Sequence, residues 1–157
     1  MRLTSPEYAD GGTMPARFAG TGVAGGMNAS PPLSWDDPPA GALSFALAVI
    51  DVHPVAHHWV HWLVADISGD VRGLAERASL TPAMPPGSLE LASTFGRSGY
   101  GGPQPPAGTG PHDYVATLYA LDVSRLGAHA DSSWEDVQTA MAGHVLGTAT
   151  LVGRFGR

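Results

Sequence analysis

The chain has 157 residues, about the size of one domain, so we expect a single domain over residues 1–157. Its net charge is −6 and its 8 basic residues, all arginines, are spread along the chain. This excludes the clustered basic surface of a nucleic-acid groove. Cysteine is absent, which excludes disulfides, thiolate metal sites and cysteine nucleophiles. No apolar run reaches the ~20 residues of a membrane span, and the first residues lack a secretory signal, so we expect a cytoplasmic protein.

The first two thirds of the chain predict short strands, because glycine and proline repeatedly interrupt the apolar runs. Arg17-Phe18 has the composition of an edge strand. Leu43–Asp51 is apolar almost throughout, which is typical of a central strand covered on both faces. His58–Ile67 is the next predicted strand. A short helical turn over Val71–Arg77 and a second edge strand over Leu89–Ala92 follow it.

The last third predicts one long loop, two strands and one helix. Tyr100–Pro111 is a glycine- and proline-rich loop between apolar segments. Strands are expected over Tyr114–Val123 and Thr148–Phe155. Between them we expect a helix near residues 134–146, with Gly147 as its stop signal.

The start of this helix has the spacing of a capping box. Ser133 can cap the first turn, and Asp136 follows three residues later. The apolar residues that recur at helical spacing are Trp134, Val137, Met141 and Val145. One face of the helix should therefore be buried.

Four histidines lie close together in the sequence, at His53, His57, His58 and His61. We expect no structural zinc site there, because residues four apart on a strand lie ~13 Å apart. His61 shares a strand face with Trp59 and Leu63, and an imidazole among apolar neighbours needs a hydrogen-bond partner or a ligand. We therefore interpret His61 as a pocket residue. No metal and no cofactor are expected.

The loop before the third main strand is the other candidate site. Its closely spaced glycines leave backbone N–H groups accessible to an anion, although an ordinary surface loop would have the same composition. His112 and Tyr114 follow the loop and, two residues apart on a strand, point to the same side.

The chain resembles the phosphatidylethanolamine-binding protein family, in its bacterial and archaeal branch related to the Raf kinase inhibitor protein. The matching segments keep the family's order: Leu3-Thr-Ser-Pro, Ser30-Pro-Pro-Leu-Ser-Trp35, Ser44–Asp51, Trp59–Ala65, Tyr100–Tyr114, Leu118–Asp122 and His144–Arg157. The resemblance implies a mainly β fold, an antiparallel Greek-key β-sandwich with a small helical C-terminal part. It also implies one pocket for phosphate-like anions or phospholipid head groups. The pocket residues it implies are Asp51, His61, Gly101, Gly102, Pro103, Gln104, Pro105, Pro106, His112 and Tyr114.

Three positions depart from the family pattern. His53 stands where the family has a second aspartate, Gln104 replaces a cysteine, and Asp113 replaces an arginine. The last change reverses a charge beside His112 and weakens the case for a dianionic ligand. It also favours a denser acid–base cluster, whose members would be Asp51, His53, His61, His112 and Asp113.

The first functional hypothesis is therefore a protein that binds a small anionic or zwitterionic ligand in this pocket. The alternative is an enzyme of small-molecule biosynthesis, such as a cyclase or isomerase that uses His/Asp acid–base chemistry. A protein-interaction regulator is a third reading. A homodimer is the assembly to test. His61 and His112 should be residues whose loss harms function more than folding.

Overall fold

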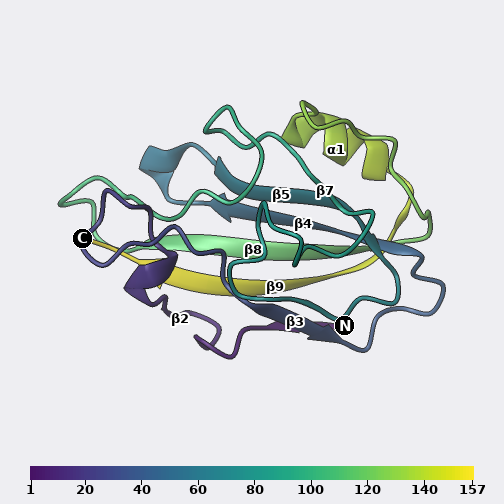
Figure 1. Cartoon of the computed structure of the whole chain (residues 1–157), viewed down its shortest axis with the longest axis horizontal. Coiled ribbons are helices and arrows are strands. Elements are labelled where there is room, and N and C mark those ends of the chain that lie inside the picture. The colour runs from purple at the N-terminus through teal and green to yellow at the C-terminus, as the bar shows by residue number, and fades with distance from the viewer.

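A computed structural model describes the whole chain, Met1–Arg157. It is mainly β, with two sheets and one short α-helix near the C-terminal end (Figure 1). The larger sheet has the strand order β2-β9-β8-β4-β5-β7 and the smaller one β1-β3-β6. The elements are β1 (Arg2–Thr4), β2 (Gly12–Thr13), η1 (Ala16–Phe18), β3 (Leu33–Asp36), β4 (Ser44–Asp51), η2 (Pro54–Ala56), β5 (Trp59–Ser68), β6 (Gly73–Leu74), β7 (Leu89–Glu90), β8 (His112–Leu121), α1 (Trp134–Met141) and β9 (Val145–Phe155). The predicted fold class is confirmed.

Strand β4 lies in the middle of the larger sheet, as its apolar sequence predicts. It pairs antiparallel with β5 on one side and with β8 on the other. Its side chains alternate between the two faces in a way that the sequence explains. The large residues Phe45, Leu47 and Val49 belong to one core cluster, whereas Ala46 and Ala48 belong to a second. Small residues on that second face leave room for a helix to pack closely.

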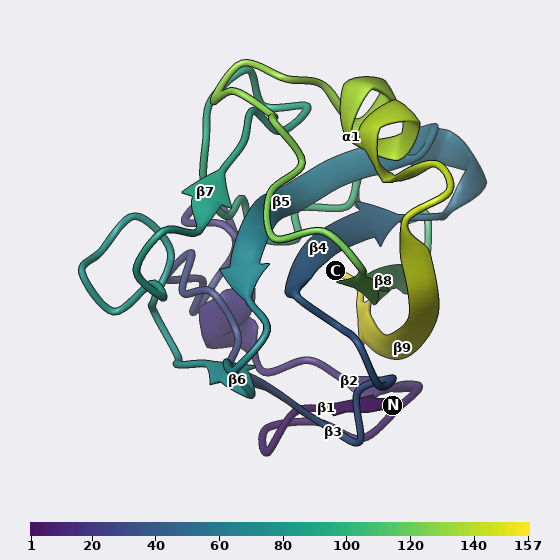
Figure 2. The ribbon, with the colours of Figure 1, turned by 90° about the vertical axis from the view of Figure 1, so that its right-hand side faces the viewer.

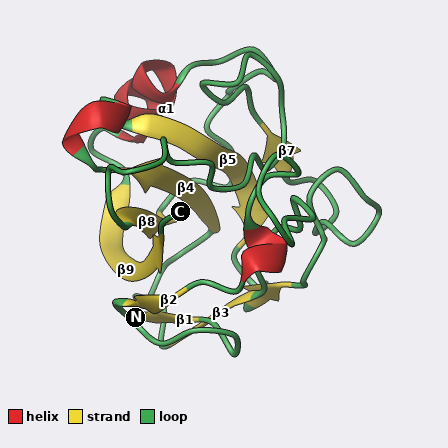
Figure 3. Ribbon diagram, turned by 90° about the vertical axis from the view of Figure 1, so that its left-hand side faces the viewer, coloured by secondary structure: helices red, strands yellow, loops and turns green.

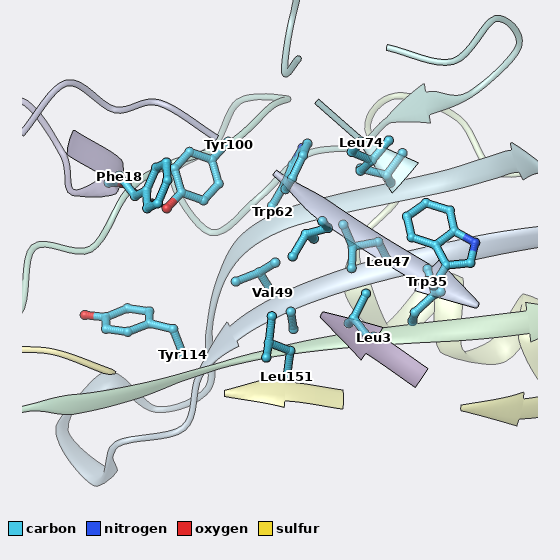
Figure 4. Packing of buried hydrophobic residues seen from close by; sticks show 14 of the residues in the cluster. Leu3, Phe18, Trp35, Leu47, Val49, Trp62, Leu74, Tyr100, Tyr114 and Leu151 are labelled. Atoms are coloured by element: carbon cyan, nitrogen blue, oxygen red, sulfur yellow. Dashed lines mark hydrogen bonds between the residues drawn. The ribbon is translucent and has the colours of Figure 1, made fainter. Parts of the chain in front are cut away.

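The six-stranded sheet lies between the three-stranded sheet and α1 (Figures 2 and 3). On the first side, Trp35 and Leu3 of the small sheet pack with Leu47 and Trp62 (Figure 4). On the second side, Val137 and Met141 of α1 pack over Leu63, Leu121 and the two alanines of β4. Both faces of the central strands are thereby removed from water. No helix has the length and apolar character that crossing a membrane requires.

The four main strands form where the sequence predicts them, each within a few residues. The expected capping box is also present, since the Ser133 hydroxyl accepts from Asp136 N and the Asp136 carboxylate accepts from Ser133 N. The helix ends earlier than expected, at Met141. Gly143 takes a positive φ of 83°, and Val145 begins β9 instead of extending the apolar stripe.

Two short elements were predicted wrongly. Arg17-Phe18 lies in the 3-10 helix η1, because Pro15 precedes it and its carbonyl accepts from Phe18 N at 3.1 Å. Val71–Arg77 contains no helical turn. Gly73 and Leu74 instead pair with the edge of β3, and the backbone of Arg77 turns away with a φ of 62°. Leu89–Glu90 does form the predicted edge strand, against β5.

Candidate functional site

A pocket of about 530 Å³ lies where β4 ends and where β5 and β8 begin. The antiparallel register creates this site, because Asp51 at the end of β4 is paired with Trp59 on one side and Tyr114 on the other. Residues 61 and 112 lie close by for the same reason. The side chains around the pocket are Asp51, Val55, Ala56, His57, Trp59, His61, Thr94, Phe95, Gln104, Pro105, Pro106, His112 and Tyr114.

Asp51 and His112 line one part of the pocket, and together with His53 and Thr109, which contact them from outside the lining, they form what we call the polar wall. The buried Asp51 carboxylate accepts from His112 Nδ1 at 2.7 Å and from His53 N at 2.9 Å. The other ring nitrogen of His112, Nε2, lies 2.8 Å from the Thr109 hydroxyl. The His53 ring stacks on the His112 ring, with centroids 3.8 Å apart and planes 7° from parallel. Both ring nitrogens of His112 are therefore within hydrogen-bond distance of another side chain.

The opposite side, the aromatic wall, consists of Trp59, His61, Phe95 and Tyr114. The Trp59 and Phe95 rings meet edge to face at 5.3 Å, and the His61 ring meets both Phe95 and Tyr114 edge to face, at 5.4 and 5.0 Å. Trp59 and Phe95 remain partly exposed at the mouth of the pocket, while Tyr114 is buried. This wall is apolar except for one imidazole and one phenol.

His61 makes a single side-chain hydrogen bond, from Nδ1 to the carbonyl oxygen of Gly101 at 2.6 Å. A carbonyl oxygen can only accept, so Nδ1 carries a proton and Nε2 of the neutral ring has a free lone pair. Burial lowers the pKa of His61, and this outweighs the opposing effects of the Gly101 carbonyl and the Asp51 charge. At neutral pH the ring is therefore neutral, and Nε2 is an acceptor.

The Tyr114 hydroxyl is buried and has no hydrogen-bond partner. Figure 4 shows it pointing away from the core side chains Val49 and Leu151. Burial raises the pKa of Tyr114, as do the nearby Asp51 charge and the approach of the hydroxyl to the Asp51 carboxylate, so the phenol keeps its proton. Buried hydroxyls nearly always have partners, and one that lacks a partner in a pocket is available to a ligand. The aromatic wall thus offers one free acceptor and one free donor.

No arginine is among the side chains around the pocket. Arg154 forms an ion pair with Asp113, Nε to Oδ1 at 2.9 Å, on the other side of β8. Arg157 near the pocket donates from Nε to the Pro105 carbonyl at 2.6 Å. The lining therefore contains no permanent positive charge, and its one carboxylate, Asp51, already accepts two hydrogen bonds.

Comparison with known proteins is consistent with this geometry. A family model described as phosphatidylethanolamine-binding protein matches residues 4–156. The chain belongs to the phosphatidylethanolamine-binding protein family. It is 40% identical to the UPF0098 protein of Methanothermobacter thermautotrophicus, over 100% of this chain and 99% of that protein. Its identity to the UPF0098 protein YbhB of Escherichia coli is 36%, over 99% of each chain. The crystal structure of E. coli YbcL, described as a member of the mammalian PEBP family, superposes with a TM-score of 0.92 at 29% identity, covering 99% of this chain and 98% of YbcL.

Most of the residues that the family resemblance implied lie at one pocket in this PEBP chain. Asp51, His61, Gln104, Pro105, Pro106, His112 and Tyr114 all line it. Gly101, Gly102 and Pro103 are not part of the lining. The Gly101 carbonyl accepts from His61, Gly102 N donates to Asn28 Oδ1 at 2.7 Å, and the Pro103 carbonyl accepts from Gly20 N at 3.0 Å.

The acid–base cluster expected from the sequence assembles only in part. His53 joins it through the stack on His112. Asp113 does not, because neighbouring residues on a strand point to opposite faces, and its side chain is 43% exposed and paired with Arg154. No group of three or more His, Asp or Glu side chains has the arrangement to hold a metal ion.

Sequence reasoning missed three parts of this PEBP site. Thr94 and Phe95 come from the turn after β7, which carries no chemical motif and meets the pocket only through the fold. Thr109 lies inside the recognised loop, but nothing in its composition singled it out. His57 lines the pocket because a left-handed backbone with a φ of 50° ends η2 there. None of these positions has a local sequence signal.

Proposed function

We propose that this PEBP protein binds a small molecule whose polar end, anionic or zwitterionic, contacts His61 and Tyr114. The observation that carries the proposal is the pair of buried, unused hydrogen-bonding groups on the aromatic wall, beside an Asp51–His112 pair whose groups are bound to each other. The volume, about 530 Å³, falls within the ~300–1,000 Å³ of small-molecule sites. The phosphate-containing head group suggested by the family name is one ligand of this kind.

The protonation of His61 sets how an anion binds. In the neutral ring Nε2 has a lone pair, which repels an anionic oxygen, whereas the protonated ring donates from Nε2 and adds a positive charge. Anion binding is therefore linked to proton uptake. Because burial lowers the pKa of His61, this proton is taken up below the ordinary histidine value of about 6.5. Affinity for phosphate or acetate should rise as the pH falls toward 5.

Thermal unfolding with phosphate, acetate or O-phosphoethanolamine between about pH 5 and 8 tests the proposal. A ligand at ~100-fold excess over its dissociation constant should stabilise the fold by about 2.7 kcal/mol. The stabilisation should grow toward acidic pH. It should disappear in His61→Asn, whose amide can still donate to the Gly101 carbonyl, and persist in His129→Ala, an exposed histidine outside the pocket. Absence of any ligand-dependent shift across this range would overturn it.

An enzyme is the second candidate, and one observation favours it. The desolvated, neutral imidazole of His61 and the phenol of Tyr114 meet edge to face in one pocket, with ring centroids 5.0 Å apart, and the phenol hydroxyl has no hydrogen-bond partner. A free base beside a free hydrogen-bond donor is the minimum arrangement for moving a proton on a bound molecule.

A further inference from the structure

We propose that the aromatic wall removes a proton from the carbon next to the carbonyl of an apolar, uncharged ketone, with His61 as the base and Tyr114 as the donor to the carbonyl oxygen. The proposal rests on the pocket's capacity to bind small molecules, and it adds a reaction and a substrate class.

His61 is held in position as a base. Its Nδ1 donates to the Gly101 carbonyl at 2.6 Å, and Gly101 N donates back to the His61 carbonyl at 2.8 Å, so both backbone and ring are fixed to one residue. The charged or titratable groups facing its ring are Asp51 from β4 and His112 and Tyr114 from β8. Asp51 and His112 are bound to each other at 2.7 Å. Nε2 is the nitrogen left to accept a proton.

Tyr114 supplies the second group that the reaction needs. Its buried hydroxyl lies near the Asp51 carboxylate but makes no hydrogen bond of normal geometry within the protein, so it can turn to a carbonyl oxygen at little cost. A donor already in place where negative charge develops is the main way in which enzymes stabilise an enolate oxygen. Together the two side chains can contact the two ends of one H–C–C=O unit.

The proton transfer balances without any further reactant. Nε2 of His61 takes the proton as the C–H bond breaks, the C–H electron pair forms the C=C bond of the enolate, and the carbonyl electrons move to oxygen. The oxygen then accepts from the Tyr114 hydroxyl. Return of a proton from His61 to the same carbon regenerates the ketone, and return to a different carbon isomerises it.

The surface around these groups selects an apolar substrate. Val55 at the mouth is 50% exposed, and Trp59 and Phe95 are 37% and 36% exposed, so a ring or hydrocarbon placed there covers apolar surface already in contact with water. No arginine lines the pocket to neutralise a carboxylate or phosphate on such a substrate. An uncharged ketone that carries an apolar ring fits both features.

The experiment uses 2-tetralone, an uncharged ketone fused to a benzene ring, with acidic benzylic protons beside its carbonyl, in D₂O at pD near 7. Deuterium uptake is followed by NMR, and binding is followed separately through tryptophan fluorescence, since Trp59 is at the mouth. We expect exchange at least tenfold above buffer, saturating with ketone. The rate should fall as the pH drops, because acid protonates His61. Anion binding at His61 should show the opposite pH trend.

Variants separate this inference from the proposed function. His61→Asn should abolish catalysed exchange, and Tyr114→Phe should reduce it at least tenfold. In both variants 2-tetralone should still bind and quench the tryptophan fluorescence. His129→Ala should match the parent. Binding without exchange above buffer would overturn the inference and leave the binding proposal intact. Exchange that survives in His61→Asn would overturn the role of His61, and failure of 2-tetralone to bind would overturn the substrate class.

Discussion

The two walls of the pocket carry similar residue types and use them in opposite ways. On the polar wall both nitrogens of His112 and both oxygens of Asp51 have partners within the protein. On the aromatic wall, His61 keeps one nitrogen free and Tyr114 keeps its hydroxyl free. Hydrogen bonds made within the protein stabilise the fold, whereas unused groups are available to a ligand. His112 is therefore bound within the protein, whereas His61 has a ring nitrogen that a ligand can use.

The largest effect should come from breaking the polar wall. Asp51→Ala and His112→Ala each leave a buried polar partner without its hydrogen bond, since the two side chains are only 5% and 1% exposed. Each substitution should lower the free energy of unfolding by about 3 kcal/mol in urea titrations. The double variant should cost much less than the sum of the two. Additive effects would show that the pair does not act as a unit.

This expectation corrects the equal treatment of His61 and His112 that the sequence suggests. His61→Asn keeps the hydrogen bond to Gly101 and should leave the melting temperature within a few degrees of the parent. The sequence could not separate the two residues, because the difference depends on Thr109 and Asp51 reaching His112 and not His61.

A smaller effect of opposite sign is expected on the aromatic wall. Tyr114→Phe removes a buried hydroxyl that has no partner, so the folded state should gain up to about 1 kcal/mol in unfolding experiments while ligand binding weakens. Tyr119→Phe, on the same strand outside the pocket, is the matched control for loss of a phenol. A clear loss of stability in Tyr114→Phe would mean that its hydroxyl is bound within the protein and is not free for a ligand.

Much of the fold follows from local sequence signals. Three features were predictable because each depends on neighbouring residues: the continuous apolar run of β4, the capping box of α1 and the order of the main strands. The 3-10 helix η1 and the pairing of β6 were not, since both form through contacts with distant segments. The end of α1 was misjudged because Val145 fits a helical stripe and a strand equally well.

The sequence predicts which residues lie at the pocket, but not the hydrogen bonds that connect them. Family resemblance identified Asp51, His61, His112 and Tyr114, and strand alternation explains why Asp113 points elsewhere. Phe95 needed the three-dimensional structure, because a turn distant in sequence brings it to the pocket, and the contact of Thr109 with His112 depends on how the loop before β8 folds back. The cytoplasmic location, the single-domain organisation and a homodimer stay predictions.

Both proposals depend on the difference between His61, which has a free Nε2, and His112, which does not. Long-range ¹H–¹⁵N NMR of the histidine rings at pH 7 measures this directly, because protonated and unprotonated ring nitrogens have well-separated shifts. We predict that His61 carries its proton on Nδ1, with an unprotonated Nε2 whose shift changes when a pocket ligand is added. The His112 nitrogens should change little. A proton on Nε2 of neutral His61, or a ligand response confined to His112, would contradict the account.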